Sequence, residues 1–159
     1  MEALEIYTIG HSNLELERFV DALRRNAIDV VVDTRTSPYS RYVEWANRER
    51  LAAELKAAKI GYRFAGGELG GKPADPSLRT SDGAPDYDKI AATPHYRRGI
   101  EELIAAASHD RLALLCSEAN PMECHRERLI ARTLRARGCA VKHIKSDGSL
   151  LGEVQGTLF

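Results

Sequence analysis

Strand-like and helix-like segments alternate along almost the whole chain. Short runs of apolar and β-branched residues predict five strands, over 4–9, 28–32, 60–64, 111–116 and 140–144. Amphipathic spacing predicts helices over 13–26, 44–59, 96–107 and 124–137. This alternation predicts the α/β class, here a three-layer sandwich with a mainly parallel, roughly five-stranded sheet that helices cover on both faces.

Local signals define the limits of the domain. Ser12 is followed by Glu15 in the form of a capping box, so we expect Ser12 to cap the first helix. Residues 65–95 form a long irregular segment, of the kind that serves as a lid or a binding loop. We therefore expect one α/β domain over 1–148, containing this loop, and a C-terminal tail over 149–159.

Composition limits the partners of the chain. Lys and Arg number 23 in the 159 residues, as do Asp and Glu, so no overall positive charge is present for coating a nucleic acid backbone. Three cysteines do not indicate a disulfide framework. The sequence has no signal peptide and no apolar stretch near the roughly 20 residues that cross a bilayer. We expect a cytoplasmic protein that does not bind membranes.

Unusual polar residues follow each predicted strand. The carboxyl ends of parallel strands meet at one edge of an open α/β sheet, and ligands bind there. We therefore expect the residues at the strand ends to form one site. They are Gly10, His11, Ser12, Asp33, Arg35, Ser40, Arg41, Gly70, Gly71, Glu118, Cys124, His125, Arg126 and His143.

Part of this set is suited to binding an anion. Arg35, Arg41 and Arg126 could make bidentate contacts with a phosphate or carboxylate. The starts of the first and last helices offer free backbone N–H groups. Alternatively, the arginines pair with Asp33 and Glu118 to fix loops. The remaining residues of the expected ligand-binding set are Gly10, Ser12, Ser40, Gly70, Gly71 and His143.

Another part is suited to catalysis. Cys124 stands at a predicted helix start beside a histidine and an arginine, a setting that lowers a thiol pKa. It could be a nucleophile with His125 or His11 as its base, or a small buried residue at a helix–sheet junction. Asp33 could be a general base or a loop cap, and Glu118 completes the catalytic candidates.

The cofactor is left open by the sequence. Cys116, Cys124, His125, His11 and Glu118 are residue types that could bind a divalent metal such as zinc. The spacing of the two cysteines matches no structural zinc motif. Cys116 ends an apolar strand, which favours core packing for this residue.

The strand-end blocks resemble those of a known family, the bacterial and archaeal domain of unknown function 488. Thr34 stands where the family often has valine, and Ser117 where alanine is usual. The resemblance implies an α/β fold and a pocket built from these blocks, with a leaning toward nucleotide or nucleic-acid work, and supplies no reaction. The blocks that carry it are 8–12, 31–35 with Pro38, Ser40 and Arg41, 69–71, 115–118 with Pro121, 124–126 and 143–144.

The C-terminal tail resembles a docking peptide. Residues Gln155–Phe159 are similar to the peptide with which bacterial replication and repair proteins dock on the DNA sliding clamp, with Gly156 in place of the usual leucine. The alternative is that Leu158 and Phe159 pack on the domain.

Three functions follow from these observations. The leading hypothesis is an enzyme acting on a phosphate-bearing substrate, in nucleotide or nucleic-acid processing or repair. Its partner would be a small phosphate-bearing ligand or a nucleic acid. One alternative is a non-catalytic module that binds a nucleotide or a metal. Another is a thiol-dependent transferase or redox protein that uses Cys124 together with Cys116.

Overall fold

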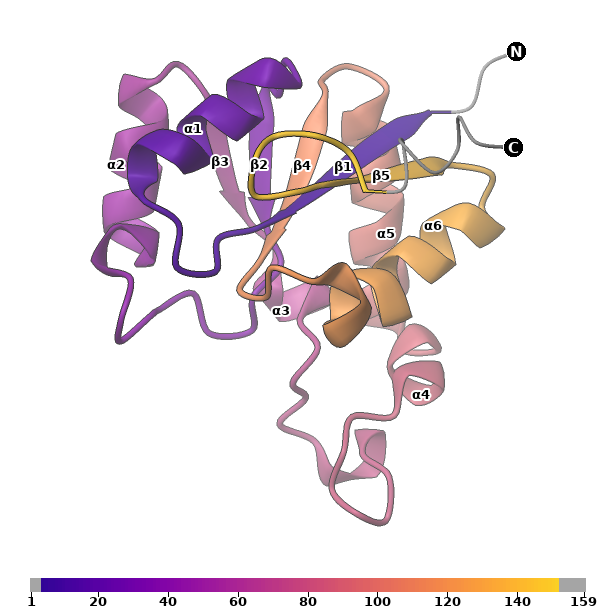
Figure 1. Ribbon diagram of the computed structural model, residues 1–159. Coiled ribbons are helices and arrows are strands. Elements are labelled where there is room, and N and C mark those ends of the chain that lie inside the picture. Colours follow the sequence, from indigo (N-terminus) through magenta and orange to yellow (C-terminus); the bar gives the residue numbers. More distant parts are fainter. Residues whose placement is uncertain (1–3, 152–159) are drawn as a thin grey trace.

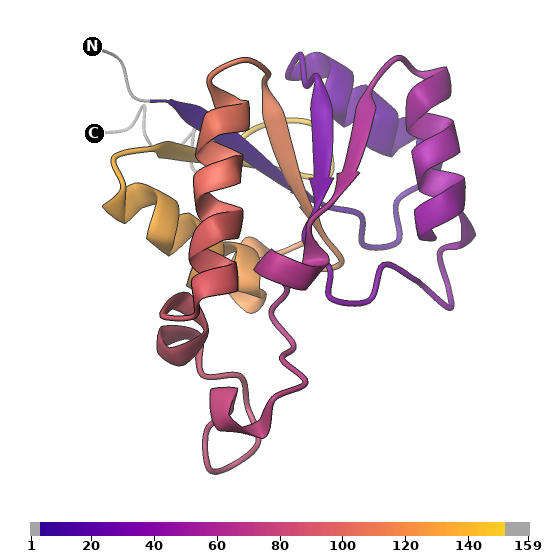
Figure 2. The same ribbon diagram turned by 180° about the vertical axis from the view of Figure 1, so that it is seen from behind.

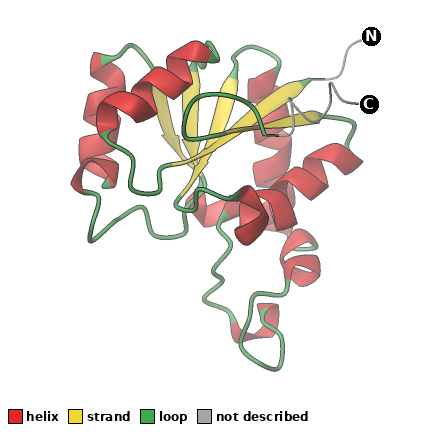
Figure 3. Ribbon diagram, viewed as in Figure 1, coloured by secondary structure: helices red, strands yellow, loops and turns green. Residues whose placement is uncertain are grey.

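The computed structural model describes residues 4–151, which form a five-stranded, all-parallel sheet between two layers of helices (Figures 1 and 3). The spatial order is β3-β2-β4-β1-β5, so β4 lies at the centre and is buried along its whole length. The predicted three-layer α/β class is confirmed. The strands are β1 (Glu5–Gly10), β2 (Val30–Asp33), β3 (Gly61–Phe64), β4 (Leu112–Cys116) and β5 (Ala140–Ile144).

Each face of the sheet has its own helices and its own core (Figures 1 and 2). On one face lie α1 (Leu16–Arg25) and α2 (Arg48–Ala57), with the 3-10 turn η1 (Glu44–Ala46) before α2. On the other face lie α5 (Pro94–Ala107) and the last helix, which consists of η4 (Arg126–Ala131) and α6 (Arg132–Ala136).

Side-chain alternation decides which face each strand end serves. Val31 packs in the core under α1 and α2, whereas Leu114 packs in the core under α5. Side chains two residues apart in a strand point to the same face of the sheet. Asp33 therefore lies on the face of Val31, and Cys116 lies on the face of Leu114. Asp33 and Cys116 therefore leave the same edge of the sheet on opposite faces.

The turn between β1 and α1 differs from the prediction. The helix begins at Leu16, with Glu15 as its N-cap residue and without a side-chain capping bond, so the expected Ser12 capping box is wrong. Ser12 instead has a positive φ of 44°. The reason is tertiary, since the backbone N–H groups of His11 and Ser12 donate to the carbonyl oxygens of Cys116 and Ser117.

The segment over 65–95 contains short helices that the sequence did not predict. It projects past the carboxyl edge of the sheet (Figure 1). Arg79 orders the projection by donating to the carbonyl oxygens of Pro73 and Gly83, and Asp75 and Asp86 cap two of its helices. The helices are α3 (Gly66–Leu69), η2 (Pro76–Leu78) and α4 (Tyr87–Ala91).

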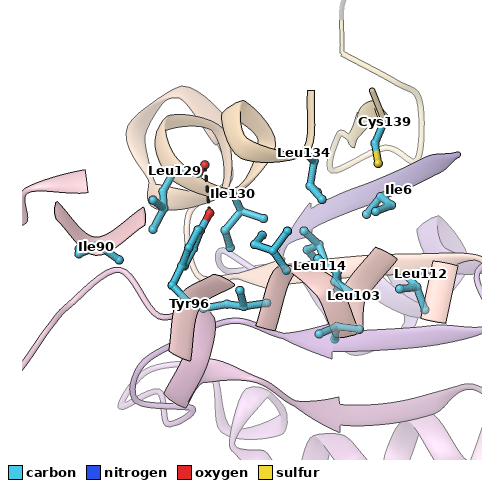
Figure 4. Close-up of a cluster of buried hydrophobic side chains, with 13 residues drawn as sticks. Ile6, Ile90, Tyr96, Leu103, Leu112, Leu114, Leu129, Ile130, Leu134 and Cys139 are labelled. Carbon is cyan, nitrogen blue, oxygen red and sulfur yellow. Dashed lines mark hydrogen bonds between the residues drawn. The ribbon is translucent and has the colours of Figure 1, made fainter. Parts of the chain in front are cut away.

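The last helix begins later than predicted, and its first part is a π-helix. After the 3-10 turn η3 (Pro121–Glu123), Cys124 is extended, and η4 then runs directly into α6. Leu129 and Ile130 of η4 pack beside Tyr96 of α5 in the core shown in Figure 4. The Tyr96 hydroxyl contacts the Leu129 carbonyl oxygen at 3.3 Å and the Thr133 hydroxyl at 2.8 Å. These contacts fix the helix that follows Cys124.

Candidate functional site

A cleft of about 190 Å³ opens at the carboxyl edge of the sheet, beside the end of β4. Its walls come from the loops after β2, α3 and β4, together with Pro85 and Tyr87 at the end of the projecting segment. The cleft therefore combines thiols, an imidazole and side chains of both charge signs. These side chains are Arg35, Lys72, Cys116, Glu118, Cys124 and His125.

Two free cysteines meet in this cleft. The Sγ atoms of Cys116 and Cys124 lie 3.0 Å apart, at hydrogen-bond distance for sulfur. Cys116 ends the central strand, and Cys124 comes from the extended position before η4. The Sγ atom of Cys124 also accepts the backbone N–H of Arg126 at 3.4 Å. Cys124 is therefore part of a small hydrogen-bond network with Cys116 and the backbone of Arg126.

This network shifts the pKa values of the two thiols in opposite directions. The hydrogen bond from Cys116 lowers the pKa of Cys124 to about 4, against the opposing effect of burial. The His125 side chain, the Arg126 N–H and the Arg126 charge act in the same direction as Cys116. The same hydrogen bond, followed by burial, raises the pKa of Cys116. Cys124 is thus the thiolate and Cys116 the protonated donor.

Arg126 holds the loop between β4 and η3. Its side chain has no exposed surface, and its guanidinium donates to the carbonyl oxygens of Glu118 at 2.8 Å and Ala119 at 2.7 Å, and to the Thr8 hydroxyl at 3.3 Å. All three acceptors are neutral, and buried charges are stable only when compensated. The Arg126 charge also contributes to the lowered pKa of Cys124.

Gly10 allows the loop to approach β1. A Cβ atom built on Gly10 would lie 1.7 Å from the Glu118 carbonyl oxygen and 3.1 Å from the Arg126 guanidinium. No other residue fits there without moving the loop that Arg126 anchors. The glycine of the Gly-His-Ser block is therefore a packing requirement of the site.

His125 is held from two sides. Its Nε2 atom lies 3.0 Å from the carbonyl oxygen of Thr34, which can only accept, so Nε2 carries the proton. Gly71 packs on the ring, since a Cβ atom there would lie 2.6 Å from Cβ and Cγ of His125. The imidazole is thus fixed in position beside Cys124, where it acts to lower the pKa of that thiol.

Asp33 and Arg35 form a separate buried cluster on the face covered by α1 and α2. The Arg35 guanidinium binds Asp33 through Nε at 2.8 Å and Nη2 at 2.7 Å, and the Tyr62 hydroxyl donates to Asp33 at 2.6 Å. Burial and this carboxylate raise the pKa of Tyr62. Both oxygens of Asp33 are therefore occupied, and the residue acts to orient Arg35. The buried Nη1 atom of Arg35 has no hydrogen-bond partner among the described residues.

His11 belongs to the same face and does not line the cleft. Its Nδ1 atom donates to the Ser12 carbonyl oxygen at 2.8 Å, and its ring contacts Trp45 edge to face with centroids 6.1 Å apart. Its buried Nε2 atom has no partner within the described part of the chain. Burial lowers the pKa of His11, so the ring is neutral.

His143 lies beyond Arg126, away from the thiols. Its Nδ1 atom contacts the Thr8 hydroxyl, and its Nε2 atom donates to Glu127 at 2.9 Å. Burial lowers the pKa of His143. Because Thr8 also accepts from Arg126, His143 is linked to the site through the support of that arginine.

The predicted site residues thus lie in the cleft, in the buried cluster around Asp33, and in the loops near both. Five of them line the cleft, namely Arg35, Gly71, Glu118, Cys124 and His125. In the loop after β2, the Ser40 hydroxyl accepts the Val43 N–H at 3.0 Å and Arg41 is exposed. Gly70 packs on Thr36, whose hydroxyl a Cβ atom would approach to 2.3 Å.

The cleft also contains residues outside the predicted set. Cys116 is buried, as its place at the end of an apolar strand predicts, and it also lines the cleft. Lys72 directly follows the Gly70–Gly71 pair and could have been found from that position. Thr36, Ser37 and Ser117 carried no comparable signal.

Within residues 4–151, no group of three or more His, Cys, Asp and Glu side chains is placed to hold a metal ion. The predicted clamp-docking peptide, Gln155–Phe159, lies outside the described residues. In the part of the chain that is described, no helix has the length and apolar character to span a bilayer.

Comparison with known proteins identifies one family. The model of the family described as Domain of unknown function DUF488 matches residues 15–133, which include Asp33, Arg35 and the segment from Cys116 to Arg126. Neither a curated protein nor a solved structure matches the chain. The match covers most of the sequence. The chain belongs to the family Domain of unknown function DUF488.

Proposed function

We propose that this chain is an enzyme in which the Cys124 thiolate attacks a small, negatively charged substrate bound in the cleft. The observation that carries the proposal is the position of Cys124 in the cleft wall, where its Sγ atom lies 3.0 Å from Sγ of Cys116 and accepts the Arg126 N–H. A thiolate, unlike a thiol, is a nucleophile at neutral pH.

The supporting residues have distinct roles in this proposal. Arg126 compensates the charge of the thiolate and holds the loop after β4. His125 acts to lower the pKa of Cys124, while Thr34 and Gly71 keep its ring in place. Because each group that stabilises the thiolate is fixed by the fold, the nucleophile needs no separate base to remove its proton.

Lys72 supports a negatively charged substrate. It lines the cleft beside Arg35, whose own charge is compensated by the buried ion pair with Asp33. A lysine ammonium binds a phosphate as a point charge. Phosphate-bearing molecules, including nucleotides and nucleic-acid components, are therefore the substrates proposed.

The pH dependence of alkylation tests the nucleophile. An ordinary thiol, with a pKa of about 8.5, loses roughly tenfold in alkylation rate for each pH unit below that value. We expect iodoacetamide to modify Cys124 at a rate that changes less than about threefold between about pH 8 and about pH 5.5. Peptide mass spectrometry of reduced protein would measure the rate at each cysteine.

Cys139 provides the control within the same molecule. It is buried directly before β5, away from the cleft, and burial raises its pKa. Its alkylation should be slow and should fall steeply with pH. Equal, steep pH profiles at Cys124 and Cys139 would refute the proposed nucleophile. Absolute rates at one pH would not decide, because a thiolate of low pKa is also a weaker nucleophile.

The charge of the substrate has its own test. Inorganic phosphate should slow the alkylation of Cys124, and Lys72→Ala should weaken this protection by about 3- to 10-fold in the half-protecting concentration, as expected for the loss of one ionic contact. Lys56→Ala, an exposed change on α2, is the matched control. Equal protection in all three proteins would exclude Lys72 from anion binding.

A further inference from the structure

The second thiol of the cleft is available for chemistry. Cys116 lines the cleft with Cys124, and their Sγ atoms are 3.0 Å apart, compared with about 2.05 Å in a disulfide bond. Closing the gap requires about 1 Å of movement. Cys116 is fixed at the end of the central strand, whereas Cys124 is extended between a 3-10 turn and a π-helix. The change in backbone required at Cys124 is therefore local.

We infer that Cys116 and Cys124 form a dithiol–disulfide couple and that the cleft reduces small disulfides that carry a negative charge. This inference rests on the proposed role of Cys124 as the nucleophile. It adds Cys116 as the residue that resolves the intermediate, and it names small anionic disulfides as a substrate class besides the phosphate-bearing molecules proposed above.

The reaction balances with the groups present. The Cys124 thiolate attacks one sulfur of the substrate, a new S–S bond forms, and the substrate S–S bond breaks. The leaving thiolate takes the proton of the Cys116 thiol. The Cys116 thiolate then attacks Sγ of Cys124, closing the protein disulfide and releasing the second substrate thiolate. Two protein thiols are oxidised and one disulfide is reduced, and a dithiol reductant such as dithiothreitol restores the protein.

Arg126 explains why the resolving thiol becomes reactive only after the first step. In the resting site Cys116 donates to the Cys124 thiolate, which opposes ionisation of Cys116. Once Cys124 is in a mixed disulfide, it has no negative charge, and it no longer favours the protonated form of the Cys116 thiol. The buried Arg126 guanidinium, which favours the thiolate form of both cysteines, then stabilises the anion on Cys116. Arg126 therefore stabilises the Cys124 thiolate before the first step and the Cys116 thiolate after it.

Three disulfides of similar size and different charge provide the test. Dithiodiglycolate is anionic, hydroxyethyl disulfide is neutral and cystamine is cationic. Each would be added to reduced protein, and the thiols released and the mass of the protein would be measured. We expect an internal Cys116–Cys124 disulfide, identified by peptide mapping, to form at least about 5-fold faster with the anionic reagent than with the cationic one, because Lys72 in the cleft wall attracts the former.

Two variants separate the roles of the cysteines. Cys116→Ser should stop at a stable mixed disulfide on Cys124, and Cys124→Ser should form neither product. Cys139→Ser, outside the cleft, should behave as the unchanged protein. Circular dichroism of each variant would confirm that it is folded before its reactivity is compared.

The outcomes distinguish this inference from the proposed function. If Cys124 keeps the flat alkylation profile but no internal disulfide forms with any reagent, Cys116 is not a resolving thiol and the inference fails, while the nucleophile stands. A steep profile at Cys124 would overturn both. Formation of the internal disulfide without preference for the anionic reagent would overturn the substrate class.

Discussion

Arg126 and Glu118 are joined by a hydrogen bond of 2.8 Å from the guanidinium Nη2 atom to the backbone carbonyl oxygen. Glu118 contributes its main chain to this contact, and its exposed side chain lines the cleft. The same nitrogen donates to the next carbonyl oxygen, of Ala119. A single buried side chain therefore sets both the path of the loop after β4 and the electrostatic field at Cys124.

Replacing Arg126 should damage stability and chemistry together. Arg126→Met leaves two loop carbonyl oxygens without their donor, and we expect a loss of about 2–4 kcal/mol in the free energy of unfolding in urea. Where the variant remains folded, the alkylation profile of Cys124 should shift to higher pH because the compensating charge is gone. Arg132→Met, at an exposed arginine paired with Asp88, should change stability by less than about 0.5 kcal/mol.

Gly10→Ala tests the packing of β1 against the loop. The added methyl group would lie 1.7 Å from the Glu118 carbonyl oxygen, so the loop must move, at a cost of about 1–3 kcal/mol. Gly67→Ala is a matched control, because no atom lies within 4 Å of a Cβ there and the residue is helical. It should be neutral or stabilising by up to about 1 kcal/mol. Similar urea midpoints for both variants would contradict the close approach at Gly10.

Asp33→Asn should lower the free energy of unfolding, and activity should be lost as a consequence. The change leaves the buried Arg35 without its charged partner, which costs about 3–5 kcal/mol. Tyr62→Phe removes a single hydrogen bond to the same carboxylate and should cost about 1.5–3 kcal/mol. An Asp33→Asn protein with unchanged stability would show that the carboxylate has a different role from orienting Arg35.

His11 should make stability depend on pH. Burial lowers its pKa, so the folded protein binds fewer protons than the unfolded chain at pH values below the ordinary histidine pKa of about 6.5. The stabilisation is therefore present above about pH 6.5 and is lost as the pH falls through that value toward the lowered one.

Comparison with His11→Asn isolates this contribution. Between about pH 7 and about pH 5, the unfolding free energy of the unchanged protein should fall more steeply than that of the variant, by at most about 1.4 kcal/mol per pH unit. The exposed His95, changed to Asn, serves as a control and should leave the slope unaltered. Parallel slopes in all three proteins would show that His11 does not titrate as a buried histidine.

The sequence by itself determined the layers of this protein. The β-branched run that ends at Asp33 and the apolar run that ends at Cys116 could be stable only as buried parallel strands, and the helical spacing between them required crossovers on both faces. This also placed the polar blocks at one edge, since a parallel sheet has all its carboxyl ends together.

Only the tertiary structure decided which of those blocks meet. Asp33 and Cys116 share an edge but face opposite sides, a division that follows from strand registers formed across the sheet. Ser12 could not cap its helix because its backbone is bonded to the loop after β4, a segment about 100 residues away in sequence. Cys116 and Cys124 approach each other because Arg126 and Gly10 bend that loop back, and such long-range contacts have no local sequence signal.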